Sequence, residues 1–139
     1  MPYGKFTNEF KEYLFDLSLR NTGVPIESMY IGLSSSEINE ESKLIDISEI
    51  TENNYERQLI NFTSPISELN ITKIFNSEEI NFGTWEEDSS VEIKSAFITN
   101  IKNDTDGMLM IYFPLEDSII PFTNDELTIT KDQLEVNLE

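Results

Sequence analysis

The spacing of hydrophobic residues along this chain changes after about residue 28. In residues 5–20 apolar side chains recur every three or four positions, which places them along one side of an α-helix. From residue 29 onward, apolar and polar residues form short alternating runs separated by acidic turns, which is typical of β-strands. The pattern predicts a mainly β protein: an N-terminal amphipathic helix and linker in residues 1–28, and an antiparallel β-sandwich, jelly-roll or immunoglobulin-like, in residues 29–139.

The predicted helix covers residues 5–20. We expect it to stop before Gly23, which suits the residue after a helix, and Pro25, which cannot continue one. Its apolar stripe, which Phe15 and Leu19 widen, either packs on its own domain or docks on a neighbouring subunit. The residues of this candidate assembly interface are Phe6, Phe10, Tyr13, Leu14 and Leu17.

The clearest predicted hairpin joins residues 91–101 to residues 108–113. Asp106-Gly107 is expected to supply the positive φ angles of a tight turn, and Pro114 is expected to keep the second strand from continuing as a central strand. Residues 34–54 are too long for a structureless loop, so they form a functional excursion or contain a short element near residues 44–47. The other predicted strands are residues 29–33, 55–62, 71–75, 80–82, 127–130 and 134–138.

Aromatic residues supply the predicted core. Trp85 is the only tryptophan, and we expect it to anchor the core with Tyr55 and Phe97, although an exposed tryptophan would also suit a sugar. Arg57 lies in the predicted strand 55–62 of an acid-rich chain, so we expect it to pair with a nearby carboxylate.

The charge is uneven along the sequence. Residues 1–28 contain four acidic and three basic residues, whereas residues 29–139 contain 23 acidic and six basic residues, a net charge of −17. Such a surface repels nucleic acid and anionic membranes, and it either attracts a basic partner or keeps copies soluble. No apolar run is long enough to cross a bilayer and the N-terminus lacks a signal-peptide core, so we expect synthesis in a cytoplasm.

The residue types argue against catalysis. The chain has no histidine and no cysteine, which removes Ser-His and Cys-His nucleophiles and the usual zinc and iron sites. A carboxylate pair remains as an enzymatic option, but the 27 acidic residues single out no pair. Residues 103–107 resemble the start of a calcium loop, yet the EF-hand register places Phe113 where the bidentate glutamate belongs. We therefore expect no enzymatic activity, no cofactor and no metal.

The order of the segments resembles a family of small structural proteins of tailed bacteriophages, labelled tail-fibre, neck or collar proteins. In that family an amphipathic helix precedes a strand similar to residues 29–35, and a "Y-x-R" strand matches residues 55–57. A segment that ends in Trp85 and a final pair of strands over residues 124–138 follow in the same order. Asparagine, which tolerates left-handed backbone, or glutamine replaces glycines of the family pattern. The replaced positions are Asn53, Asn54, Asn124 and Gln133.

The resemblance implies a non-enzymatic virion protein, made in the host bacterial cytoplasm, that joins or decorates neck, collar, tail or fibre components. Its expected partners are other phage virion proteins and further copies of itself, with no nucleic acid and no membrane. Two alternatives remain: an acidic mimic of DNA that blocks a nucleic-acid-binding protein, and a carbohydrate-binding receptor module.

Overall fold

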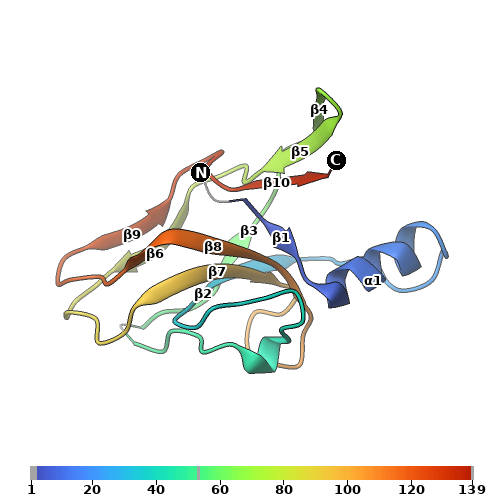
Figure 1. The fold of residues 1–139 in the computed structure, drawn as a ribbon. Coiled ribbons are helices and arrows are strands. Elements are labelled where there is room, and N and C mark those ends of the chain that lie inside the picture. Colours follow the sequence, from blue (N-terminus) through green and yellow to red (C-terminus); the bar gives the residue numbers. More distant parts are fainter. Residues whose placement is uncertain (1–2, 53, 139) are drawn as a thin grey trace.

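The computed structural model describes residues 3–52 and 54–138 and has a mainly β fold with one α-helix near the N-terminus (Figure 1). The predicted antiparallel, sandwich-like fold is confirmed. None of the helices in the described residues is long and apolar enough to span a membrane. The elements are β1 (Lys5–Phe6), α1 (Asn8–Ser18), β2 (Met29–Ser34), the 3-10 helix η1 (Leu44–Asp46), β3 (Gln58–Ile60), β4 (Ile66–Glu68), β5 (Ile71–Phe75), β6 (Ile80–Thr84), β7 (Ile93–Thr99), β8 (Leu109–Ile119), β9 (Glu126–Ile129) and β10 (Glu135–Leu138).

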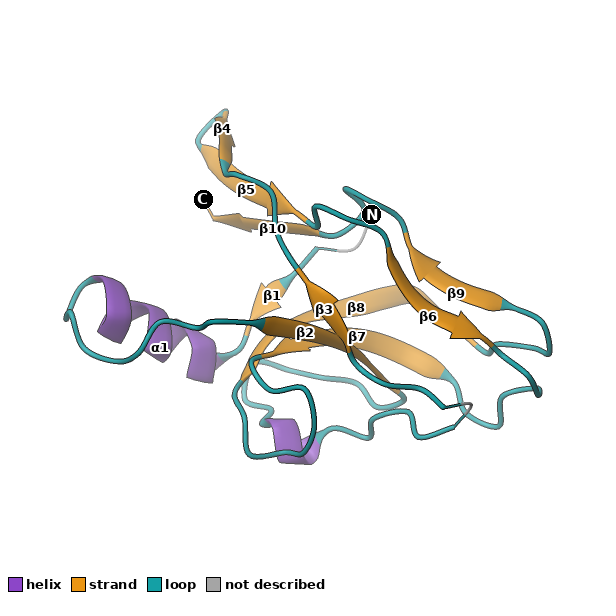
Figure 2. Cartoon of the chain, turned by 180° about the vertical axis from the view of Figure 1, so that it is seen from behind, coloured by secondary structure: helices purple, strands orange, loops and turns teal. Residues whose placement is uncertain are grey.

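The strands form one large sheet and two small ones (Figure 2). The large sheet has the order β1-β8-β7-β2-β3, and the small sheets are β10-β5-β4 and β6-β9. Side chains from all three sheets meet in one hydrophobic core, for example Ile98 of β7, Phe82 of β6 and Val136 of β10. This arrangement explains the alternating run of β6, in which Ile80 and Phe82 are buried while Asn81 and Gly83 are exposed.

The helix begins three residues later than predicted. Lys5 and Phe6 form β1, which pairs with Tyr112 and Ile111 of β8, so the expected helical position of Phe6 is wrong. The side chain of Thr7 caps the helix by accepting a hydrogen bond from the backbone N–H of Phe10. β1 therefore ties this part of residues 1–28 to the sheet, while the division of the chain at residue 28 stays a prediction.

The helix also ends earlier than predicted, at Ser18 rather than residue 20. The backbone N–H groups of Leu19 and Arg20 both donate to the carbonyl of Phe15, and Asn21 then adopts a φ of 53°. These features turn the chain out of the helix before Gly23, whose own φ is 93°. Gly23 thus allows a later turn instead of following the helix directly.

Residues 34–54 contain the short element that was predicted near residues 44–47. The 3-10 helix η1 places Leu44 against the outer face of the large sheet. There Leu44 and Ile38 pack with Phe97, Leu109 and Tyr112 in a second, smaller core. The large sheet is consequently covered on both faces, which its predominantly apolar strands β7 and β8 require.

The β7–β8 hairpin is confirmed, but its turn and its end differ from expectation. Gly107 does not have a positive φ. Asp104 does, at 71°, and a Cβ at Gly107 would lie 2.3 Å from the side chain of Ile101. β8 runs on past Pro114 to Ile119, but as predicted it is not a central strand there. β1 pairs with β8 only at Ile111 and Tyr112, so the missing N–H of Pro114 breaks no ladder.

The predicted strand 55–62 is shorter in the structure, where only Gln58–Ile60 form β3 and Arg57 lies just before it. The asparagines that replace family glycines behave as expected: Asn54 and Asn124 have φ values of 56° and 74°. Asn53 lies outside the described residues. At the fourth position the left-handed conformation belongs to Asp132, with a φ of 63°, rather than to Gln133. The shift by one residue explains how glutamine is tolerated there.

Candidate assembly surfaces

The first turn of α1 is fixed to the body of the protein. Thr7 is fully buried, and its hydroxyl donates to the carbonyl of Leu109 at 2.5 Å. The carboxylate of Glu9 accepts from the backbone N–H of Leu109 at 3.0 Å and pairs with Lys43 at 2.8 Å. This pairing raises the pKa of Lys43. The helix is therefore held at its N-terminal end by contacts with β8 and with residues 40–43.

The five residues predicted as an assembly interface lie mostly against the chain's own core. Phe10 is buried, and Phe6, Tyr13 and Leu14 are partly buried beside it. The rings of Phe6 and Phe10 meet edge to face at 5.3 Å, and those of Phe10 and Tyr13 stack at 6.0 Å. Leu17 is half-buried. Much of the predicted stripe thus packs against the protein's own core, and its contact with another subunit stays a prediction.

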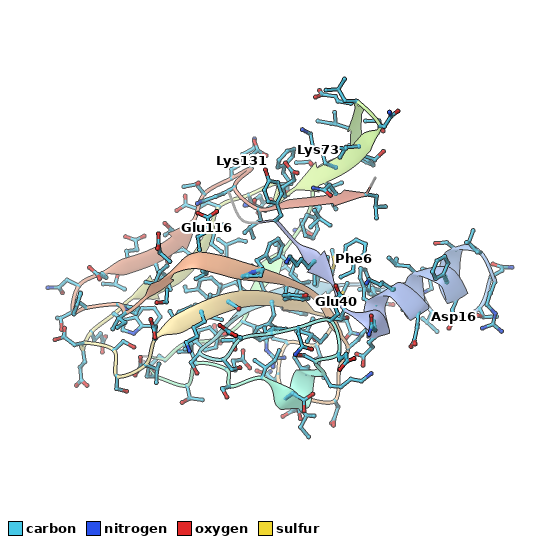
Figure 3. The ribbon with its side chains drawn as sticks, in the orientation of Figure 1. Phe6, Asp16, Glu40, Lys73, Glu116 and Lys131 are labelled. Atoms are coloured by element: carbon cyan, nitrogen blue, oxygen red, sulfur yellow. The ribbon has the colours of Figure 1, made fainter. Side chains whose placement is uncertain are left out.

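The second half of α1 projects away from the sandwich, as Figures 1 and 3 show for the turn that carries Asp16. Three large apolar side chains are exposed on this projection: Phe15 at 61%, Leu19 at 76% and Val24 at 78%. The hydroxyl of Tyr13 donates to the carbonyl of Val24 at 2.6 Å and holds the returning chain beside the helix. The projection, residues 15–24, is a compact structure with apolar groups directed to solvent.

A second projection is the hairpin formed by β4 and β5 (Figure 2). β4 is the outer strand of the sheet β10-β5-β4, and all three of its residues are exposed. Its free edge presents unpaired backbone groups, which are suited to pairing with another chain. Ile66 at the start of the hairpin and Leu69 at its tip are exposed apolar residues.

The most polar buried cluster is structurally saturated. Glu49 accepts two hydrogen bonds from the Arg57 guanidinium, at 2.8 and 2.9 Å, which confirms the ion pair predicted for Arg57. Glu49 also accepts from the Tyr55 hydroxyl at 2.6 Å, and that hydroxyl accepts from the backbone N–H of Leu33. Burial, followed by the bond to Glu49, raises the pKa of Tyr55. Because these donors and acceptors satisfy one another, the cluster fixes loops rather than offering a reactive group.

The predicted core residues occupy interior positions to different degrees. Trp85 is 1% exposed, so its ring is not available to stack on a sugar. Phe97 is fully buried between the large sheet and residues 34–54, and Tyr55 is partly buried against Phe82. Among the described residues no group of three acidic side chains is arranged to hold a metal ion.

The sequence reasoning missed the exposed residues. Phe15 and Leu19 were grouped with the buried stripe, although an i, i+4 pair offset from Phe10 and Leu14 indicates a different side of the helix. The sequence indicates the exposure of Leu69 more weakly. Leu69 is an apolar residue beside Asn70, and it lies between the predicted strands 55–62 and 71–75. Only the backbone angles of the turn reveal its unusual environment.

A β-sandwich with two projecting apolar segments and an internally satisfied polar cluster is typical of a structural module. Residues 5–137 match the sequence model of the family described as podophage GP4 fiber I protein gp80. The chain therefore belongs to this family of phage fibre proteins, which confirms the resemblance to phage structural proteins noted from the sequence. It is a phage structural protein and a component of the virion. No curated protein matches the chain.

Proposed function

We propose that this protein joins or decorates the neck, collar, tail or fibre of the virion as an oligomer, and that residues 15–24 attach it to another virion component. The observation that carries the proposal is the exposure of Phe15, Leu19 and Val24 on a segment that stands away from the sandwich. These side chains contribute little to the fold where they are, since large apolar groups directed to solvent gain no burial.

The charge distribution supports the same surface. Residues 1–28 are close to neutral, whereas the rest of the chain has a net charge of −17. A neutral apolar projection approaches a second protein with less repulsion than the acidic body does. Burying two such side chains would contribute about 3 to 6 kcal/mol before the cost of association.

The test is incorporation into virions. A phage that carries Phe15→Ser and Leu19→Ser is compared with one that carries Leu59→Ser, an exposed leucine on β3. Quantitative peptide mass mapping of purified particles should show loss of the double variant and normal copy number of the control. Equal incorporation of both variants would show that residues 15–24 are not the attachment segment, and absence of the wild-type protein from particles would refute the virion role.

A further inference from the structure

Leu69, at the tip of the β4–β5 hairpin, is poorly suited to the backbone conformation of its turn. Leu69 and Asn70 form the two-residue connection, with φ values of 50° and 69°. Two positive φ angles are typical of a type I′ turn, in which asparagine, aspartate and glycine are favoured. Asn70 fits this preference, whereas a bulky side chain such as that of Leu69 is rare in the left-handed region.

Leu69 also gains nothing from packing. It is 94% exposed, the highest exposure among the large hydrophobic residues described. The leucine thus combines backbone strain with an apolar side chain in water, and asparagine or glycine at this position would relieve both. A residue that opposes its own fold in two ways indicates a role outside the isolated chain.

A cavity of matching character lies between β8 and β9. Its volume is about 120 Å³, and most of its lining is apolar, including Phe113, Leu115 and Leu127. Ile119, which is partly exposed, contributes to the mouth. An apolar cavity of about 150 Å³ accepts benzene, and the side chain of leucine has fewer carbon atoms, so one leucine fits.

The tip and the cavity of one molecule do not meet. Both views place the β4–β5 hairpin at a different end of the molecule from the adjoining ends of β8 and β9 (Figures 1 and 2). A contact between Leu69 and this cavity therefore joins two copies, the hairpin of one to the sandwich of the next.

The charges on the two surfaces are complementary. Residues 66–75 contain one acidic and one basic residue, and within the described part of the chain the base, Lys73, forms no ion pair. The cavity itself has no acidic lining residue, but two exposed acids neighbour its lining in the sequence: Asp117 lies between Leu115 and Ile119 on β8, and Glu126 precedes Leu127 on β9. Figure 3 shows Lys73 on the hairpin. The Lys73 ammonium lies 5.8 Å from the ring centre of Phe75. In a strongly anionic protein, this neutral hairpin, whose lysine has no ion pair, is suited to approach Asp117 and Glu126.

We propose that the occupant of the cavity is a second copy of this chain, which inserts Leu69 between β8 and β9 and places Lys73 towards Asp117 and Glu126. The inference rests on the proposed oligomeric role and specifies the contact that makes the oligomer. Because two different surfaces meet, the contact is head-to-tail, and its repetition closes a ring or extends a row of copies.

Sedimentation of the purified full-length chain tests the contact with four proteins: wild type, Leu69→Asn, Leu115→Trp to fill the cavity, and the matched control Leu59→Asn. Wild type and control should form the same oligomer. Each of the other variants should self-associate about tenfold or more weakly, the scale expected for one buried leucine side chain. Leu69→Asn should at the same time unfold at an equal or higher temperature, because asparagine suits the turn.

Mixing gives the decisive result. Leu69→Asn retains an intact cavity and Leu115→Trp retains an intact tip, so an equimolar mixture should form a heterodimer through the one remaining contact. A mixture that stays monomeric, or a Leu69→Asn protein that assembles like wild type, overturns the inference while leaving virion incorporation unaffected.

A monomeric wild type at all concentrations overturns both this contact and the oligomeric part of the proposed function. If Leu115→Trp does not fold, Asp117→Lys takes its place as the second variant, because it leaves the hairpin intact, and it should weaken assembly at low salt.

Discussion

Arg57 and Glu49 form a bidentate ion pair, in which Glu49 belongs to residues 34–54 on the outer face of the large sheet. The Nε and Nη2 atoms of Arg57 lie 2.9 and 2.8 Å from the two carboxylate oxygens of Glu49. The remaining donors of the guanidinium reach the carbonyls of Ile101 and Asp104, and the guanidinium carbon lies 5.6 Å from the ring centre of Phe97. One buried side chain thus joins residues 49–57 to the β7–β8 loop.

Removing this arginine should be costly. Arg57→Met leaves the carboxylate of Glu49 without its charged partner and two carbonyls without donors, so we expect a loss of about 3 kcal/mol in the free energy of unfolding. Urea denaturation measures it. Lys11→Met is the control, because it breaks the exposed Lys11–Glu40 pair at 3.4 Å and should cost less than about 0.5 kcal/mol. Equal effects of the two substitutions would contradict a structural role for the buried pair.

Gly32 should be intolerant of any side chain. A Cβ at this position would lie 2.5 Å from Cζ of Phe97 and 2.7 Å from the Tyr55 hydroxyl. Gly32→Ala should therefore destabilise by about 1 to 3 kcal/mol through overpacking. Gly23→Ala is the control that measures backbone preference without steric overlap. Its Cβ would meet no atom within 4 Å, although its φ is 93°. It should cost about 1 kcal/mol or less. A harmless Gly32→Ala in thermal unfolding would show that the Tyr55 cluster shifts freely.

Thr7 should control whether α1 stays attached. Thr7→Val removes both the helix cap on Phe10 and the bond to the Leu109 carbonyl, and we expect a loss of about 2 kcal/mol. Relative to wild type, Thr7→Val should speed amide hydrogen exchange in residues 8–18 more than it does in β7. Thr22→Val removes an exposed hydroxyl bond to Asp16 and should stay within about 0.5 kcal/mol of wild type. Unchanged exchange in α1 would argue against the cap as its main tether.

Glu52 should contribute to stability above the acidic range. The hydroxyl of Ser89 donates to its carboxylate, and this bond is the main cause that lowers the pKa of Glu52 from its ordinary value of 4.5. The contribution is present above that unfolded value and is lost as the pH falls through the lower folded value.

Comparing wild type with Glu52→Gln therefore tests the direction in which the stability changes with pH. The difference in the free energy of unfolding should be largest near neutral pH and should shrink as the pH is lowered below about 4.5. Urea denaturation at several pH values measures it. A difference that is constant with pH would mean that the ionised carboxylate is not what stabilises this loop.

The sequence predicted those features that depend on local pattern. Alternation located β5 at Ile71–Phe75 without error, and the length of residues 34–54 indicated the element that became η1. Arg57 was expected to find a carboxylate because acids are so abundant, but its partner Glu49 comes from an irregular segment and had no signal of its own.

Long-range contacts caused the errors. Phe6 satisfies the helical spacing, yet pairing of residues 5–6 with β8, more than 100 positions away, makes it a strand residue. The second strand of the hairpin was predicted to end at residue 113, but β8 reaches Ile119, because its outer side has no partner beyond Tyr112 and so tolerates Pro114. The exposure of Leu69 could not be recognised, because it depends on the turn in which this residue adopts a φ of 50°.

The bond from the backbone N–H of Gly4 to the carbonyl of Glu135, at 2.7 Å, has a consequence for how the molecule reaches its native state. Together with β1, it fixes residues 4–6 between β8 and residue 135, each more than 100 positions further along the chain, so residues 4–6 stay unpaired until those distant segments are available. Closing such a long loop before any local reward is slow. Final closure of the sandwich, and with it the ordering of the root of α1, is therefore a late folding event, and attachment through the helix follows completion of the body.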